Sequence, residues 1–220
     1  MAKVVVTGSN RGIGLEMCRQ LSARGDKVLA TCRVASEGLR ALDVELFEGF
    51  DVTDDTSLSR LRDHLASDSV DLLINNAGIL RRETLTDLNI DSIREQFEVN
   101  ALGPLRVTAA LKETFSNPSK VAIITSRMGS IADNTSGSRY GYRMSKAAVN
   151  MAGMSLAHDL KSHGVAVAIL HPGFVQTDMT GGAGDVPPEV SAKGLIQRID
   201  ELSLATSGTF WHAQGQILPW

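Results

Sequence analysis

The chain has 220 residues, of which 43% are hydrophobic and 21% charged, and its formal net charge is −3. This size and apolar content suit one compact domain with a substantial core. The basic residues are scattered, which argues against a nucleic-acid footprint or a polybasic membrane patch. No apolar run approaches the roughly 20 residues that cross a bilayer, and Cys18 and Cys32 lack metal-type spacing. We therefore expect a cytoplasmic protein without a metal ion or a membrane partner.

Short apolar runs alternate with helical patterns along the whole chain. Strands are predicted at residues 4–6, 27–31, 46–50, 71–74, 121–124, 165–170 and 216–218. Helices are predicted from near residue 15, over 58–65, over about 91–115 with a bend at Pro104, over 142–163 and from about 189. Strands this uniformly apolar are covered on both faces. The pattern predicts α/β architecture, with one doubly wound parallel sheet of about seven strands in a single domain, residues 1–220.

A glycine-rich segment joins the first predicted strand to the first predicted helix. It reads Thr7-Gly8-Ser9-Asn10-Arg11-Gly12-Ile13-Gly14. Glycines let the backbone approach a pyrophosphate, and a helix start offers free N–H groups and a positive dipole end. An ordinary tight loop could have the same composition, but the position between strand and helix favours a Rossmann-type dinucleotide site.

Two arginines bear on the choice of dinucleotide. An NAD site commonly has an acidic residue about 20 positions past the glycines, where it binds the ribose 2′-hydroxyl. Here the second strand ends Thr31-Cys32-Arg33 without an acid, and Arg11 lies inside the glycine loop. Guanidinium groups suit a 2′-phosphate. The pattern favours NADP(H) over NAD(H), although both arginines could simply be solvated.

Tyr142 and Lys146 lie four residues apart in a predicted helix, so their side chains share one face. A cation beside a phenol favours the phenolate, and we expect Lys146 to lower the pKa of Tyr142 toward the neutral range. The same spacing also occurs by chance on ordinary helix surfaces. Tyr140 lacks such a partner, because its fourth neighbour is Met144.

Taken together, these motifs resemble the short-chain dehydrogenase/reductase family over essentially the whole chain. The further matching segments are Asp51-Val52, Asn75-Asn76-Ala77-Gly78, Asn100, Ser126 with Gly129, and Pro172-Gly173 with Thr177. Within the family, the chain is most similar to C-factor and Sniffer-type carbonyl reductases. That narrower resemblance rests on residues 30–33, 126–130, 142–146 and 218–220.

The resemblance implies a catalytic set of four residues. Ser126 would bond the substrate oxygen, and Tyr142 would act as general acid and base. Lys146 would support Tyr142 and hold the nicotinamide ribose. Asn100 would hold a water molecule that links Lys146 to solvent, or would instead repair a helix kink next to Pro104.

The resemblance also implies a set of residues that bind the cofactor. Asp51 would bond the adenine amino group, although it could serve only as a turn residue. The full set is Gly8, Asn10, Arg11, Gly12, Ile13, Gly14, Arg33, Asp51, Val52, Asn75, Ala77, Gly78, Tyr142, Lys146, Pro172, Gly173, Val175 and Thr177.

The activity implied is an NADP(H)-dependent carbonyl reductase or alcohol dehydrogenase acting on a small molecule. A short, glycine-containing substrate loop is expected at about 176–190. The alternative is a C-factor-type signalling protein that binds NADP(H) with little turnover. The resemblance further implies a homodimer built on the two long helices, about 91–115 and 142–163. These helices carry apolar residues such as Leu102, Leu105, Val149, Met151 and Met154, which could instead serve only the subunit's own core.

Overall fold

One parallel sheet of seven strands organises the computed structural model, which describes residues 1–220. The strand order is β3-β2-β1-β4-β5-β6-β7, and every neighbouring pair is parallel. The strands are β1 Lys3–Thr7, β2 Lys27–Thr31, β3 Glu45–Phe47, β4 Val70–Asn75, β5 Phe115–Ile124, β6 Val165–His171 and β7 Phe210–His212. The doubly wound parallel sheet predicted from the sequence is confirmed.

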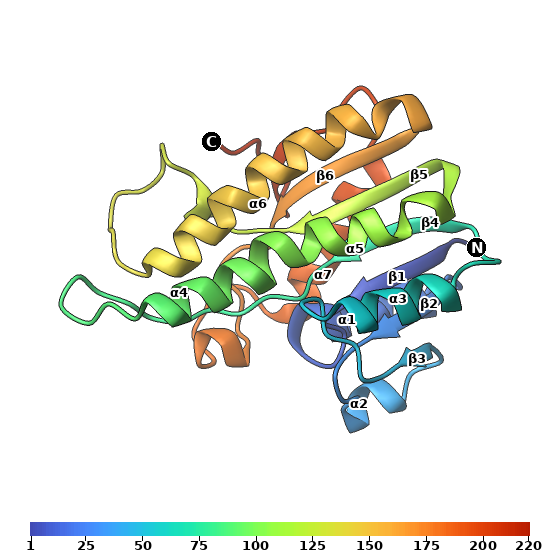
Figure 1. Cartoon of the computed structure of the whole chain (residues 1–220), viewed down its shortest axis with the longest axis horizontal. Coiled ribbons are helices and arrows are strands. Elements are labelled where there is room, and N and C mark those ends of the chain that lie inside the picture. The colour runs from blue at the N-terminus through green and yellow to red at the C-terminus, as the bar shows by residue number, and fades with distance from the viewer.

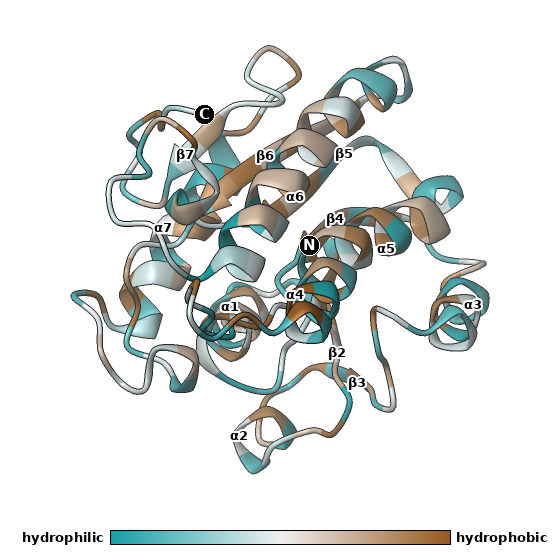
Figure 2. Ribbon diagram, turned by 60° about the vertical axis from the view of Figure 1, so that its left-hand side comes forward, coloured by the Kyte–Doolittle hydropathy of each residue, from teal (hydrophilic) through white to brown (hydrophobic).

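Helices cover both faces of the sheet (Figure 1). The α-helices are α1 Gly12–Ala23, α2 Glu37–Arg40, α3 Asp55–His64, α4 Ile90–Phe97, α5 Gly103–Leu111, α6 Tyr140–Asp159 and α7 Pro188–Glu201. Alternate residues of β1 face opposite layers: Val4 and Val6 join the core beneath α1 and α7, whereas Val5 joins the core beneath α3, α5 and α6. In Figure 2 strands β5 and β6 are largely hydrophobic, whereas the helices around them are of mixed polarity.

The long helix predicted over about 91–115 is interrupted and shorter than expected. Its parts are α4, a π-helical turn η1 at Glu98–Leu102, and α5, which ends at Leu111. Pro104 lies in the first turn of α5, and proline has no N–H group to bond the carbonyl four residues earlier. That carbonyl belongs to Asn100. The irregular turn therefore falls at Asn100, just before the proline.

The last predicted strand was placed wrongly. The seventh strand is β7, and residues 216–218 return beside it: Ile217 forms an antiparallel bridge with Trp211. The reversal occurs at Gly215, whose φ of 99° favours glycine. The strand itself is only three residues long, so its hydrophobic pattern was too short to separate from that of the returning arm.

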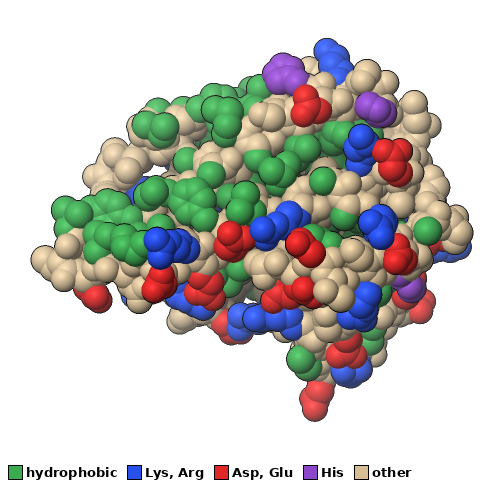
Figure 3. Space-filling view, in the orientation of Figure 1, with side chains coloured by type: hydrophobic (Ala, Val, Ile, Leu, Met, Phe, Trp, Pro, Cys, Tyr) green, Lys and Arg blue, Asp and Glu red, His purple; other side chains and the backbone are tan.

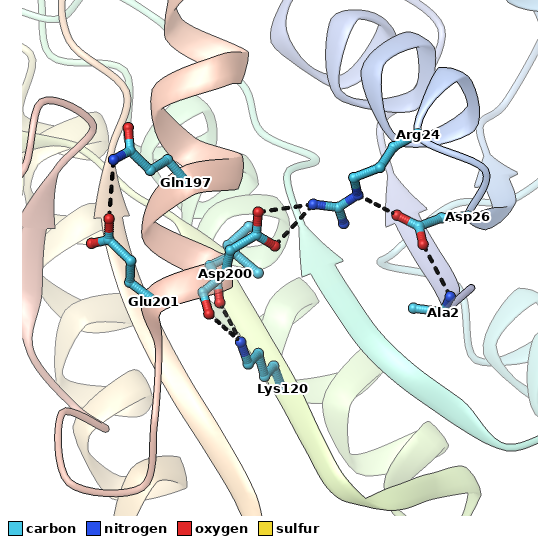
Figure 4. A network of polar contacts seen from close by, with 8 residues as sticks. Ala2, Arg24, Asp26, Lys120, Gln197, Asp200 and Glu201 are labelled. Atoms are coloured by element: carbon cyan, nitrogen blue, oxygen red, sulfur yellow. Dashed lines mark hydrogen bonds and ion pairs between the residues drawn. The ribbon is translucent and has the colours of Figure 1, made fainter.

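Polar contacts fix α7 to the amino-terminal edge of the sheet (Figure 4). The Lys120 ammonium donates to the carbonyls of Ile199 (2.6 Å) and Asp200 (2.9 Å) at the end of α7, where the helix dipole favours a cation. Arg24 contacts both Asp200 (2.8 Å) and Asp26 (2.7 Å). These contacts lie at the edge of the sheet opposite to the one where the strands end. None of the helices combines the length and apolar character needed to cross a membrane.

Candidate active site

The carboxyl edge of the sheet brings together the motifs found in the sequence. The glycine loop follows β1, Asn75 ends β4, Ser126 follows β5, and Pro172 follows β6. Parallel strands present their carboxyl ends at one edge, and doubly wound folds bind ligands there. The site predicted from scattered segments is therefore contiguous in the fold.

The glycine loop is shaped for close approach of a phosphate group. Gly8 has a φ of 67°, and a Cβ atom added to Gly14 would collide with the carbonyl of Gly8. The residue before α1, Arg11, provides no side-chain cap, so the first N–H groups of the helix remain available for an anion. These features fit a dinucleotide pyrophosphate. Gly12 lies beside Thr177, which brings the 172–177 segment over the same loop.

Asn76 is a residue that the sequence reasoning left out of the site. Its amide donates to the carbonyls of Thr7 and Gly8, both at 3.0 Å. The Thr7 hydroxyl in turn accepts from the backbone N–H groups of Asn76 and Ala77, also at 3.0 Å. This reciprocal clamp fixes the glycine loop against the end of β4. The doubled asparagine after an apolar strand was the signal available in the sequence.

Three of the expected cofactor residues turn their side chains into the core. The Asn75 amide donates to Thr108 (3.1 Å), Val52 is buried in the core beneath α5, and Val175 is 3% exposed. These three side chains therefore pack within the protein. The Asp51 carboxyl group accepts from the backbone and hydroxyl of Thr53 (2.9 and 2.7 Å), so the turn role left open for it is observed.

The remaining expected cofactor residues lie around the same edge. Pro172 and Gly173 directly follow β6, and the Pro172 carbonyl is held by the Ser191 hydroxyl at 2.8 Å. Gly78 lies against Asn100 and the Lys146 ammonium. The Asn10 carbonyl accepts from Ser36 (2.6 Å), whereas Gly12 and Ile13 open α1.

The buried face of α6 carries the tyrosine and the lysine that the sequence predicted to be catalytic. Tyr142, Ser145, Lys146, Val149 and Asn150 recur at helical spacing and are all buried. The Lys146 ammonium donates to the Ile124 carbonyl at 3.0 Å and lies 5.7 Å from the centre of the Tyr142 ring. The expected pairing of a phenol and an ammonium on one helix face is therefore present.

The pKa of Tyr142 moves in the direction opposite to the one expected. Burial raises this pKa to about 12, and the Ser126 hydroxyl opposes the increase only in part. Burial also lowers the pKa of Lys146 to about 8. Loss of solvation is thus the largest influence on both pKa values. Tyr142 keeps its proton at neutral pH, which suits a proton donor.

Asn100 lies in the π-helical turn and connects two segments of the site. Its side-chain oxygen accepts from Ile79 N–H (2.8 Å), while its amide donates to the Ile79 carbonyl (2.8 Å) and the Ser145 hydroxyl (3.0 Å). The side chain therefore positions α6 and the loop after β4. Its role in holding a water molecule stays a prediction, and would use the backbone carbonyl that Pro104 deprives of its usual helical partner.

Ser126 and Gly129 show why the spacing between them matters. Ser126 precedes the short 3₁₀ turn η3, Arg127–Gly129, and its hydroxyl oxygen accepts from Met128 N–H at 3.1 Å. A Cβ atom on Gly129 would lie 2.6 Å from the carbonyl carbon of Lys146. Glycine is therefore required for η3 to pack on α6. This contact places Ser126 beside Tyr142.

Glu83 is a second residue that sequence reasoning missed. Its carboxyl group is 2% exposed and accepts from Gln96 (2.6 Å), Ser92 (2.7 Å) and the backbone N–H of Gly141 (3.3 Å). Gly141 lies in the first turn of α6, where a negative group is favoured. Glu83 thus caps the helix that carries Tyr142 from a distant loop. No local motif in the sequence signals this long-range contact.

The two arginines expected at the cofactor differ in their surroundings. Arg11 forms an ion pair with Asp178 of the short turn η5, Asp178–Thr180, at 3.2 Å. Both side chains are largely exposed, and such pairs contribute only about 0–1 kcal/mol. Arg33 is exposed at the end of β2, and its side chain makes no hydrogen bond or ion pair. Arg33 is therefore the freer of the two for a phosphate group.

Comparison with known proteins identifies the family. The family model described as short chain dehydrogenase matches residues 2–186. The chain belongs to this family, as its motifs indicated.

Two relatives and two solved structures illustrate the similarity. The chain is 42% identical to 1-hydroxy-2-glutathionyl-2-methyl-3-butene dehydrogenase of Rhodococcus sp., over 100% of both chains. It is 46% identical to the C-signal of Myxococcus xanthus, over 69% of this chain and 93% of that protein. The NADPH-bound carbonyl reductase from chicken fatty liver superposes with a TM-score of 0.91 and 30% identity, covering 100% of this chain and 99% of the other. Carbonyl reductase Sniffer of D. melanogaster gives a TM-score of 0.93 and 26% identity, with both chains fully covered.

The buried lysine leads to a prediction about stability. Because the pKa of Lys146 is lowered from 10.5 to about 8, the unfolded chain binds more protons than the folded one between these values. Each pKa unit corresponds to about 1.4 kcal/mol, so at neutral pH the burial destabilises the fold by an amount on the order of 3 kcal/mol. Replacing Lys146 by methionine removes this destabilisation. The Lys146→Met variant should therefore gain most stability, relative to the unmodified protein, at pH 7.

Urea unfolding at several pH values between 7 and 10.5 measures this difference. We expect the advantage of Lys146→Met to shrink steadily as the pH rises above about 8. Lys161→Met, at an exposed position, is the control for the same chemical change. A constant or growing advantage across this range would contradict the assigned burial of a charge.

Proposed function

We propose that this protein is an NADP(H)-dependent carbonyl reductase that also runs in reverse as an alcohol dehydrogenase. The observation that carries the proposal is the position of Tyr142, Lys146 and Ser126 around one point at the carboxyl edge of the sheet. Membership of the short chain dehydrogenase family supports an oxidoreductase. The carbonyl reductase neighbours support the substrate class, and the NADPH-bound neighbour supports the cofactor.

Proton transfer is assigned to Tyr142. Its raised pKa keeps the phenol protonated, so its hydroxyl can donate a proton to a carbonyl oxygen as negative charge develops there. Ser126 is placed to assist, because its oxygen accepts from Met128 N–H and its hydroxyl lies within hydrogen-bonding reach of the Tyr142 hydroxyl. Two donors directed at one oxygen stabilise the developing charge.

Lys146 is assigned to positioning and charge. One N–H of its ammonium is held by the Ile124 carbonyl, which leaves two donors for the ribose hydroxyls of a bound cofactor. When bound, NADPH would supply the hydride to the carbonyl carbon. Glycines 8 and 14 and the start of α1 would hold its pyrophosphate, with Arg33 at the 2′-phosphate.

The second candidate function is a signalling protein with little turnover. The 46% identity to the C-signal favours keeping this alternative. A binding protein would need the glycine loop but not the buried catalytic face of α6. The location in the cytoplasm stays a prediction for either function.

The catalytic assignment predicts different outcomes for two tyrosines. Tyr142→Phe removes only the hydroxyl, so turnover should fall by at least the 10²–10⁴-fold that general acid catalysis typically contributes. Tyr140→Phe is the matched control, and should retain turnover within about twofold, because no lysine lies one turn away. NADPH oxidation with a panel of ketones, aldehydes and quinones measures both. Near-normal turnover by Tyr142→Phe would favour the signalling alternative.

The cofactor assignment predicts a preference for NADPH over NADH. Charge-assisted hydrogen bonds contribute roughly 1.5–3 kcal/mol, so Arg33→Ala should weaken NADPH binding about tenfold or more. NADH lacks the 2′-phosphate, and its affinity should barely change. The double variant Cys32→Asp, Arg33→Ala should prefer NADH. Fluorescence titration of both cofactors tests the assignment, which equal affinities in the unmodified protein would refute.

We further propose that the protein forms a homodimer through α4, η1, α5 and α6. Figure 3 shows hydrophobic side chains gathered over this face. Of the apolar residues expected there, Leu102, Leu105 and Met151 are 38%, 40% and 69% exposed. Val149 instead lies in the subunit's own core, and Met154 packs against the core at β7.

A charge on this surface should separate the subunits. Met151→Lys places an ammonium at the most exposed of the three positions, and should convert a dimer to a monomer at micromolar concentration. Val190→Lys, on α7 across the sheet, is the control for adding charge to an exposed apolar position. Light scattering reports the mass of each variant. An unmodified protein that is monomeric at this concentration would remove the proposal.

A further inference from the structure

Arg127 and two histidines form a cluster next to the catalytic serine that the mechanism does not use. Arg127 directly follows Ser126, His171 ends β6, and His212 ends β7. The two imidazole rings meet edge to face, with centres 4.9 Å apart. Arg127 therefore follows the catalytic serine directly, and both histidines lie at the same carboxyl edge of the sheet.

Asp133 orients the Arg127 side chain but leaves part of the guanidinium group without a partner. Its Nε atom contacts Asp133 at 2.6 Å, while its two terminal nitrogens make no hydrogen bond or ion pair in the chain. The Arg127 side chain is 55% exposed, whereas Asp133 is 24% exposed and also fixed through its N–H to Ser130 (3.1 Å). Asp133 therefore sets the plane of the guanidinium and leaves its outer end free. That end can take a carboxylate through two parallel hydrogen bonds.

The histidines add a donor without adding charge. His212 Nδ1 accepts from the backbone N–H of Gln214 at 3.0 Å, so the neutral ring carries its proton on Nε2. That atom lies 3.8 Å from the position of a Cβ added to Gly173, in the segment assigned to the cleft. Burial lowers the pKa of His171 to about 3 and also lowers the pKa of His212, with Arg127 contributing to both. Arg127 is consequently the one positive charge of the cluster at neutral pH.

We propose that Arg127, together with the Nε2–H group of His212, forms a subsite for a carboxylate on the carbonyl substrate. The inference rests on the proposed function, which places the substrate oxygen at Ser126. A free guanidinium end and a neighbouring N–H donor match the two oxygens of a carboxylate. The preferred substrates are then carbonyl compounds that carry a carboxylate several bonds from the reacting carbon.

The test compares two aldehydes that differ in one charge. 4-Formylbenzoate carries a carboxylate across the ring from its aldehyde, and methyl 4-formylbenzoate carries a neutral ester there. Arg127→Met removes the guanidinium while keeping a long side chain. It should lower kcat/KM for 4-formylbenzoate about 10- to 100-fold, mainly through KM, and leave the ester within about twofold. Arg127→Lys keeps the charge but not the planar fork, so its loss should be intermediate.

Arg82→Met is the matched control, because Arg82 is exposed and its side chain makes no polar contact. It removes the same charge from another loop and should change neither substrate. An equal loss for both aldehydes in Arg127→Met would mean that Arg127 acts only through Ser126, and would overturn the subsite. The absence of any loss would overturn it as well.

A binding measurement separates the subsite from the proposed reaction. Isothermal titration of 4-formylbenzoate into the protein with NADP⁺ present should give tighter binding than the ester, and Arg127→Met should abolish the difference. If the unmodified protein reduces neither aldehyde but shows this difference, the proposed function is wrong and the subsite stands. Equal binding of the acid and the ester by the unmodified protein would overturn the subsite whatever the activity.

Discussion

The burial of one ammonium group governs the arrangement of this site. Lys146 lies on the inner face of α6, so its charge must find a partner at the carboxyl edge of the sheet. The Ile124 carbonyl supplies that partner at 3.0 Å. Burying a charge opposes folding unless it is compensated, and functional sites are where such a cost is retained. Gly129 permits the close packing, because a larger residue there would collide with the backbone of Lys146.

Contacts from other segments hold the rest of the site to α6. Asn100 bonds both Ser145 and the backbone of Ile79. The π-helical turn between α4 and α5 is therefore tied to α6 and to the loop after β4. Glu83 caps the start of the same helix from the loop after β4. Tyr142 is therefore positioned by interactions that lie far from it in sequence. These contacts hold the phenol in place although the preceding residues, 130–139, form an irregular segment.

The sequence predicted the features that arise from local patterns. Alternating apolar runs indicated the parallel sheet, and the glycine loop and the Tyr142–Lys146 spacing indicated where the site would lie. Contacts between residues distant in the chain could not be predicted in this way. The inward rotation of Asn75 depends on Thr108, and the cap at α6 depends on Glu83, residues that no spacing rule connects. The pKa of Tyr142 was predicted in the wrong direction, because helical spacing reports a neighbouring charge but not the extent of burial.

The central claim is that a protonated Tyr142, supported by a charged Lys146, donates a proton during carbonyl reduction. The most direct test is the pH dependence of single-turnover NADPH oxidation between pH 6 and 10 with an accepted aldehyde. Because the pKa of Tyr142 is about 12 and that of Lys146 about 8, the rate constant should stay level up to about pH 8 and then fall as the ammonium loses its proton. A rate constant that rises through this range, as the phenol ionises, would contradict the account.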